Sequence, residues 1–408
     1  MSYLSYTIAM VFSFSRSHKR EFGAVIFVEL SNVRLMVFEY LAVSRVRIFF
    51  SEKKPLPRYT APGYSFDKRV ATSIASAAYQ LLHEFERVML KKNYAVTPSE
   101  IYVLYAPSIA QTSTERIYLE NKKTKAAVSQ ETLQTLLKEG EQRAILRMRE
   151  NVKKETVPFP KQAVIERALT ELTIDGYPVH DVFSKEFRDF SALISIVTIP
   201  EMLLLVVTDA CHSIFRKATL FHKVSVSETI TALRDLEKMP DRFFCALLFQ
   251  DFSVFMYVGT HDMSKQLLLS NGAKHIESGL AKSLSSSRTV MMSYAALARE
   301  DKLHGTSQSR LKKALQEAAQ NWYFDAVKAK QNMSDLLVLP KTLYVVPSGE
   351  IDEMVLATLT ESGNTTNVDF QIQVLSKKQI QNIEVTEHVS AGAEDLLLIA
   401  WILVHRGT

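Results

Sequence analysis

Glycine is scarce in this sequence, with 12 among 408 residues, about 3%, where roughly 7% is average. No two glycines are adjacent, and none are separated by a single residue. Loops that bring backbone amides against phosphate need closely spaced glycines, because a side chain would block the approach. The sequence therefore has no Walker loop, no Rossmann fingerprint and no kinase-type glycine loop.

Cysteine is also nearly absent, since Cys211 and Cys245 are the only two. Two cysteines are too few for a disulfide framework or a zinc cluster. Both lie beside apolar runs, so we expect buried free thiols in a reducing compartment. The ten histidines are dispersed, and the nearest two, His212 and His222, are ten positions apart. We therefore expect no metal site.

Clusters of one charge are missing as well. The 49 basic and 44 acidic residues leave a net charge of +5, and the short basic pairs are scattered, which is untypical of a nucleic-acid binder. No GxSxG motif occurs, so nothing indicates a hydrolase nucleophile, and we expect no catalytic residue. The composition, 47% hydrophobic and 23% charged, is that of a globular protein and excludes a disordered one.

No segment qualifies as a membrane span or a secretion signal. The basic residues follow the apolar stretch 6–14 instead of preceding it, which is the reverse of a signal peptide. The longer run 192–210 contains Pro200 and Glu201 in its middle, and 396–404 is too short to cross a bilayer. We expect a cytoplasmic protein, and peripheral attachment to the inner face of the membrane stays open.

Strands and long helices alternate along the chain. Apolar residues at three-and-four spacing predict helices, at 66–92, 129–149, 201–214, 227–239, 276–284, 288–300, 307–330 and 352–359. Runs of β-branched and aromatic residues predict strands, at 24–28, 33–42, 45–50, 101–105, 164–199 with a turn inside it, 218–226, 243–258, 265–269, 342–346 and 370–375. Two similar halves, each a strand meander followed by helices, indicate an α/β chain with mixed sheets.

This order of elements resembles that of the actin-like ATPase superfamily, in its bacterial branch of FtsA and PilM. Residues 24–41 are similar to the first phosphate hairpin of the family, 243–259 to the second, and 343–359 to the strand and loop that approach the adenosine. Residues 164–179 resemble a strand and Asn-Gly-Tyr turn of the domain inserted in this branch. The resemblance implies an α/β, actin-like (ribonuclease H-like) fold of two lobes, with a small inserted α+β domain in the first lobe.

The resemblance also divides the chain into domains. We expect the first lobe in 1–97, the inserted FtsA/PilM-type domain in 98–205, a return to the first lobe in 206–240, and the second lobe in 241–408.

The sequence departs from the family where a nucleotide would bind. Residues 247–252 read Leu-Leu-Phe-Gln-Asp-Phe where the family has Asp-Ile-Gly-Gly-Gly-Thr, and the loop at 347–350 has no glycine pair. Bulky side chains there would exclude phosphates, and Glu29 or Asp251 would repel them. We therefore expect a fold without its ATPase activity and no cofactor. If ATP and Mg²⁺ still bound, the candidate contacts would be Ser31, Asn32, Asp251, Ser253, Ser348 and Gly349.

Two classes of function stay open. The first, implied by the resemblance, is a non-catalytic scaffold that binds the cytoplasmic tail of a membrane protein in type IV pilus assembly or cell division, with self-association also open. Its partner surface would include the insert turn of Asp175, Gly176 and Tyr177. The end at Thr408, without the terminal amphipathic helix of FtsA-like members, favours the PilM-like role. The second class is an active ATPase with atypical phosphate loops, and an unrelated α/β protein with the same element order is a third interpretation.

Overall fold

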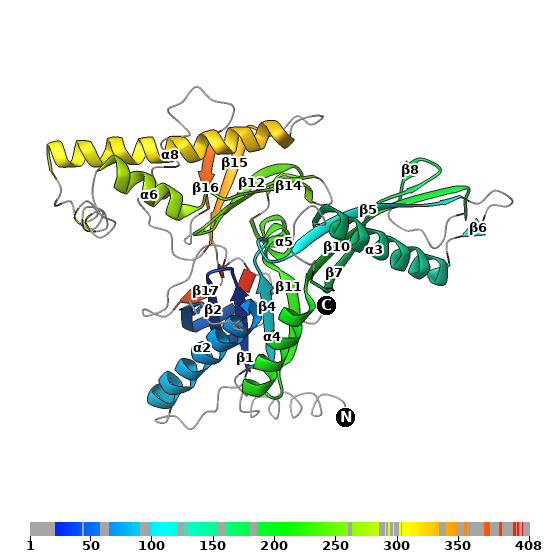
Figure 1. The fold of residues 1–408 in the computed structure, drawn as a ribbon, viewed down its shortest axis with the longest axis horizontal. Helices are drawn as coiled ribbons and strands as arrows, with labels where there is room; N and C mark the ends of the chain where they lie inside the picture. The colour runs from blue at the N-terminus through cyan, green and yellow to red at the C-terminus, as the bar shows by residue number, and fades with distance from the viewer. Residues whose placement is uncertain are drawn as a thin grey trace, which may run out of the picture.

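The fold is seen in a computed structural model of the 408-residue chain (Figure 1). The structure describes residues 21–42, 45–57, 65–89, 98–120, 126–127, 129–152, 160–179, 186–237, 239–259, 263–284, 304–333, 340–348, 371–375 and 383–385, together with single positions between 290 and 302 and between 355 and 402.

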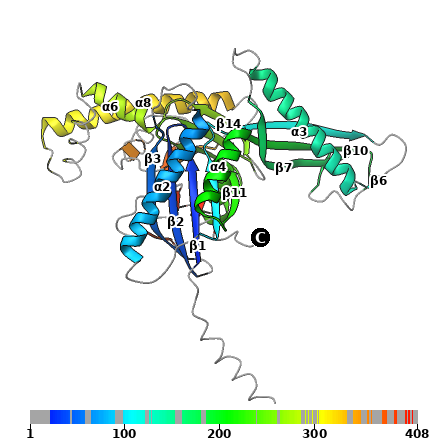
Figure 2. The same ribbon diagram turned by 60° about the horizontal axis from the view of Figure 1, so that its bottom comes forward.

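A six-stranded mixed sheet forms the first lobe. Its strands follow the order β11-β4-β1-β2-β3-β17, and their bounds are β1 (Glu21–Val28), β2 (Asn32–Ala42), β3 (Arg45–Pro55), β4 (Glu100–Tyr105), β11 (Thr219–Val224) and β17 (Ile383–Val385). The first three strands are the predicted antiparallel meander, and β4 runs parallel to both β1 and β11. Helices α2 (Phe66–Met89) and α4 (Glu201–Ile214) lie side by side against the sheet (Figure 2).

The second lobe repeats this arrangement with a five-stranded sheet in the order β14-β13-β12-β15-β16. The bounds are β12 (Phe243–Leu248), β13 (Ser253–Val258), β14 (Met263–Leu269), β15 (Thr342–Pro347) and β16 (Gln371–Val374). Helices α6 (Ala273–Ser283) and α8 (Thr306–Met333) pack together on one face. Every residue of β12 is buried, because alternate side chains face these two helices and the core shared with the first lobe.

A smaller sheet projects from the first lobe (Figure 1). It has the order β5-β10-β7-β8, with bounds β5 (Gln111–Glu120), β7 (Gln162–Ile174), β8 (Tyr177–Pro178) and β10 (Asp189–Pro200). Helix α3 (Gln130–Val152) covers one face of this sheet, and the short pair β6 (Ala126–Ala127) and β9 (Glu186–Phe187) lies beyond it. Apolar side chains of α3 and β10 form a separate core between them. We call these elements the insert.

The structure shifts the expected start of the insert. Strand β4 lies between β1 and β11 in the first-lobe sheet, because its apolar side chains are buried there as a central parallel strand. The insert sheet begins only at β5, which the pattern did not predict, since Glu115 and Ile117 are its only buried residues. Strand β17, expected in the second lobe, pairs with β3 in the first. The other domain boundaries stay predictions.

Candidate functional site

Two hairpin turns from the two lobes touch each other. The turn between β1 and β2 is closed by the Glu29 amide, which donates to the Asn32 carbonyl at 3.0 Å, and the turn between β12 and β13 by the Phe249 amide, which donates to the Phe252 carbonyl at 3.0 Å. Ser31 Oγ then donates to Asp251 Oδ2 at 2.9 Å. Residues 220 positions apart in the sequence therefore join the tips of the two hairpins.

Aromatic side chains fill the space behind this contact. The rings of Phe249 and Phe252 stack with their centroids 4.4 Å apart. Both are buried, in the same hydrophobic core as Val28 at the end of β1. Phe249, which stands where the resemblance expects a glycine, and Phe252, which stands at the threonine position, thus contribute to a continuous core between the two hairpins.

The N-terminus of α6 is closed by the same turn. Its first amides, of Ala273 and Lys274, donate to the carbonyls of Phe249 and Gln250 at 2.8 and 2.9 Å. A Cβ on Gly272, which precedes the helix, would lie 2.4 to 2.6 Å from three backbone atoms of this turn. Amides at a helix N-terminus are available to an anion only when nothing else accepts from them, and these two already have acceptors.

Asp251 also binds Lys274, whose Nζ lies 2.6 Å from Asp251 Oδ1. Partial burial alone would raise the pKa of the Asp251 carboxyl. Hydrogen bonds from Lys274 and Ser31, with the positive charges of Lys274 and Lys53, outweigh this effect and hold that pKa below its ordinary value. The carboxylate is therefore ionised at neutral pH.

Of the predicted residues, Ser253 begins β13 and Ser348 follows β15, the two strands that flank β12, and both make internal contacts. Ser253 Oγ donates to the Asn271 carbonyl at 2.5 Å and accepts from Trp322 Nε1 at 3.0 Å. The Ser348 amide donates to the Leu248 carbonyl at 2.9 Å. Gly349 is outside the described residues. The hydroxyl of Ser253 thus stabilises the second-lobe core.

Asn32 belongs to a buried polar group that the sequence analysis did not identify. Its Nδ2 donates to Glu29 Oε2 at 2.8 Å. Arg34 Nη1 lies 2.5 Å from Asp395 Oδ2 and Arg34 Nη2 lies 3.6 Å from Glu29 Oε1. The guanidinium also stands 4.6 Å above the ring of Phe27. Arg34 therefore attaches the first hairpin to Asp395 of the C-terminal segment, and Asn32 holds Glu29 within the hairpin.

The insert turn lies far from these hairpins, at the β7–β8 connection. Asp175 and Gly176 both have positive φ, +50° and +82°, and Asp175 Oδ1 accepts the backbone amides of Arg188 and Asp189 at 2.9 and 2.8 Å. Asp175 thus acts as a turn residue, as expected. Tyr177 follows it with 75% of its surface exposed.

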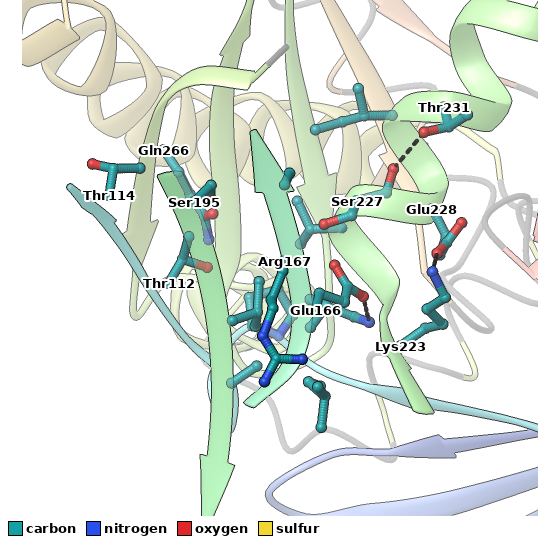
Figure 3. A pocket seen from close by; sticks show the side chains of 18 of the residues that line it. Thr112, Thr114, Glu166, Arg167, Ser195, Lys223, Ser227, Glu228, Thr231 and Gln266 are labelled. Atoms are coloured by element: carbon teal, nitrogen blue, oxygen red, sulfur yellow. Dashed lines mark hydrogen bonds and ion pairs between the residues drawn. The ribbon is translucent and has the colours of Figure 1, made fainter. Parts of the chain in front are cut away.

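A cavity of about 520 Å³ lies between the insert and the first lobe (Figure 3). One wall is the face of the insert sheet that α3 leaves uncovered, with the small side chains of Thr112, Thr114 and Ser195. The opposite wall is α5 (Ser225–Glu237) with the end of β11. Gln266 of β14 brings the second lobe to the cavity. Three parts of the fold therefore meet around one space.

Charged groups lie where the insert meets the first lobe: Glu166 is on β7 of the insert, and Lys223 and Glu228 are on β11 and α5 of the first lobe. Glu166 accepts the Val224 amide at 2.5 Å, and its burial raises the pKa of its carboxyl, although this hydrogen bond and the charge of Lys223 oppose the rise. Lys223 Nζ pairs with Glu228 Oε1 at 3.1 Å, as Figure 3 shows. The sequence pattern does not identify the residues of this cavity. Strand β5 is not predicted, so nothing indicates that its small polar residues at alternate positions share a face.

We expect His222, beside the cavity on β11, to make the stability of the protein depend on pH. Its Nδ1 lies 3.0 Å from Tyr105 Oη and its Nε2 lies 3.2 Å from Thr208 Oγ1. Burial, with the charge of His212, lowers its pKa from 6.5 to about 4.

As the pH falls, His222 of the unfolded chain takes up its proton before His222 of the folded protein does. We therefore expect stability to fall as the pH drops from 6.5 to about 4. Urea unfolding at several pH values checks this: His222→Asn should reduce the slope in that window, and the exposed His304→Asn should not. Equal slopes for both variants would contradict the assignment.

The comparisons with known proteins concern the fold. No protein-family model and no curated protein matches the sequence. A structure described as "PilM-PilN type IV pilus biogenesis complex" superposes with a TM-score of 0.51 at 14% identity, covering 94% of this chain and 97% of that chain.

Two other structures match with lower scores. The ethanolamine utilization protein EutJ from Carboxydothermus hydrogenoformans has a TM-score of 0.41 at 10% identity, covering 94% of this chain and 89% of its own. A diol dehydratase-reactivating factor has 0.45 at 8% identity, covering 94% and 99%. Among the described residues, no helix is long and apolar enough to cross a membrane. With its repeated strand order and its extended match to the PilM structure, the chain has the two-lobed actin-like ATPase fold.

Proposed function

We propose that this chain is a non-catalytic member of the actin-like fold, a scaffold that recruits a protein partner. The observation that carries the proposal is the contact between Ser31 and Asp251 at the tips of the two hairpins. By the resemblance, a nucleotide phosphate would have to lie between these hairpins. Asp251 places a negative charge there, and the rings of Phe249 and Phe252 fill the space behind it.

We expect Mg-ATP not to bind at physiological affinity. Isothermal titration calorimetry should detect no saturable binding below the millimolar range, which corresponds to about −4 kcal/mol. The reason is that phosphate would have to displace Asp251 from Ser31 and Lys274. A micromolar affinity would overturn this expectation and favour the active ATPase alternative, with Ser31, Asn32, Asp251 and Ser348 as the contacts to mutate.

For the partner site we propose the cavity between the insert and the first lobe. Its volume of about 520 Å³ is within the usual range for binding pockets, roughly 300 to 1,000 Å³. Within the described strands, β7 pairs on its outer side with β8 at Thr173 and Ile174, and the Leu172 carbonyl accepts the Val179 amide at 2.9 Å. The part of that edge before Leu172 can accept an added strand. An extended segment of a partner can therefore combine backbone pairing with side-chain contacts in the cavity.

The matched pilus structure supports one class of partner. The matched structure is titled as a complex of type IV pilus biogenesis, and this supports a cytoplasmic tail of a pilus-assembly membrane protein as the occupant. Recruitment would then take place at the inner face of the membrane. Cell division is the second setting that the resemblance implies.

A photo-cross-linking experiment tests the site. A benzoylphenylalanine at Thr114, on the cavity face of the insert sheet, should cross-link to a membrane protein in cells of the source organism. The matched control is the same residue at Lys138, which is exposed on α3 over the opposite face. We expect the cross-linked product from Thr114 only. Equal products from both positions, or none from Thr114, would overturn the cavity as the partner site.

A further inference from the structure

Strand β14 forms one edge of the second-lobe sheet. Among the described strands it pairs with β13 alone, so its other side faces away from the sheet. The outward backbone groups of an edge strand can pair with another chain, and natural proteins usually protect such an edge with charged side chains, proline or a covering element. Lys265 is the one charged residue of β14, and the stretch from Gln266 to Leu269 has no charge and no proline. This half of the edge therefore lacks the usual protection by charge.

The other edge strands of the described sheets differ from β14. Strand β5 carries Glu115, Arg116 and Glu120, and β11 carries Lys223. The edge strands β6, β8, β9, β16 and β17 have at most four residues each. Strand β14 has seven residues and spans about 23 Å. Among the described edges, it therefore offers the longest uncharged stretch to an added strand.

The leucine side chains of β14 are incompletely covered on both faces of the sheet. Leu267 and Leu269 are half-buried and pack against the second-lobe core, which α6 and α8 complete. Leu268 points to the opposite face and has 45% of its surface exposed. An added strand would remove apolar surface from water on both faces, provided that its own side chains next to these leucines are apolar. The strand that fits this edge is thus uncharged and apolar at successive positions.

The β14 edge is fixed in position beside the cavity. After its last residue, the Asn271 carbonyl accepts from Ser253 Oγ at 2.5 Å, and the Asn271 side chain contacts Asp325 of α8. An edge that is already ordered loses little conformational freedom when it binds. Gln266, in the same strand, lines the cavity (Figure 3). An extended segment that leaves the cavity past Gln266 therefore meets the edge at 267–269.

We propose that the partner segment continues from the cavity along β14 and joins the five-stranded sheet of the second lobe as a sixth strand, with apolar side chains on both of its faces. The identity of the partner rests on the proposed function of the cavity, whereas the ability of β14 to accept an apolar strand does not. The same edge selects against partners with a charged residue in this stretch, because the charge would lose its hydration next to the leucines.

The experiment combines the cross-linker at Thr114 with a charge on the β14 edge, in the full chain and in cells of the source organism. Lysine is a residue with which natural edge strands prevent pairing, so we expect Leu268→Lys to lower the Thr114 product by about tenfold. Phe324→Lys is the matched control, because Phe324 is also an exposed apolar residue of the second lobe, 53% exposed, but lies on α8. It should leave the product unchanged. Circular dichroism checks that both variants fold.

A cross-linker at Leu268 itself should give the same protein as the one at Thr114, identified by mass spectrometry, and a cross-linker at Phe324 should not. An unchanged Thr114 product in Leu268→Lys, or an equal loss in Phe324→Lys, would overturn the pairing at β14 and leave the cavity as the partner site. A product from Leu268 without one from Thr114 or Phe324 would overturn the cavity and leave the β14 edge. No product from either Thr114 or Leu268 would overturn both.

Discussion

Arg34→Ala is expected to lower the free energy of unfolding by about 3–5 kcal/mol, the usual cost of removing one partner of a buried ion pair. Asp395 is fully buried, and its Oδ2 lies 2.5 Å from Arg34 Nη1. Without the guanidinium, the carboxylate must stay charged in an apolar surrounding or take up a proton. The variant also loses the contact of the guanidinium with the ring of Phe27. Urea unfolding followed by circular dichroism measures the loss.

Arg47→Ala is the matched control. Arg47, on the neighbouring strand β3, also binds the C-terminal segment, with its Nη2 2.7 Å from Glu384 Oε2. This pair is exposed, with 44% and 37% of the two side-chain surfaces accessible, so water and salt screen it. We expect a much smaller loss of stability than for Arg34→Ala. Equal losses for the two variants would contradict the role assigned to burial.

Gly272→Ala is expected to destabilise the protein by about 1–3 kcal/mol, the usual cost of overpacking. The added Cβ would lie 2.4 Å from the Phe252 amide nitrogen, 2.5 Å from the Phe249 carbonyl oxygen and 2.6 Å from the Gln250 carbonyl oxygen. All three are backbone atoms, so no side-chain rotation relieves the clash. Helix α6 must move away from the turn and carry Lys274 with it. Thermal unfolding measures the loss of stability.

Gly279→Ala, in the interior of the same helix, should stabilise the protein. Its Cβ would lie 3.4 Å from Ala318 Cβ, an ordinary van der Waals contact. Alanine is favoured over glycine inside a helix by roughly 0.8–1 kcal/mol. A gain in stability for Gly279→Ala together with a loss for Gly272→Ala would support the close approach of α6 to the turn. Destabilisation by both variants to the same extent would count against it.

The elements could be predicted where their signals are local. The apolar spacing in α8 predicted a helix, and it now packs Leu311, Leu315 and Trp322 into the second core. The predicted actin-like fold is confirmed by the repeated strand order of the two sheets. The expected burial of Cys211 and Cys245 is also confirmed. Such patterns repeat every two to four residues, so they need no knowledge of what each element packs against.

The candidate site could be predicted only in part. Runs of apolar residues identify the two hairpins. The resemblance gives Ser31, Asp251 and Ser253 as candidate contacts for a nucleotide, and this stays a prediction. In the structure Ser31 and Asp251 contact each other, and Ser253 binds Trp322. The local sequence around a hydroxyl or carboxylate in a turn is the same whichever group the side chain contacts in the folded protein. Only the packing of the two lobes selects the partner.

The sequence by itself determined the loss of the glycine loops and the order of the elements, since both are properties of neighbouring residues. Only the tertiary structure decided that Asp251 meets Ser31 across 220 positions, that Arg34 meets Asp395 across 361, and that β5 provides a cavity wall. The physical reason is that these contacts depend on the relative placement of sheets. That placement follows from the burial of whole faces, to which every element contributes, and no short segment carries it.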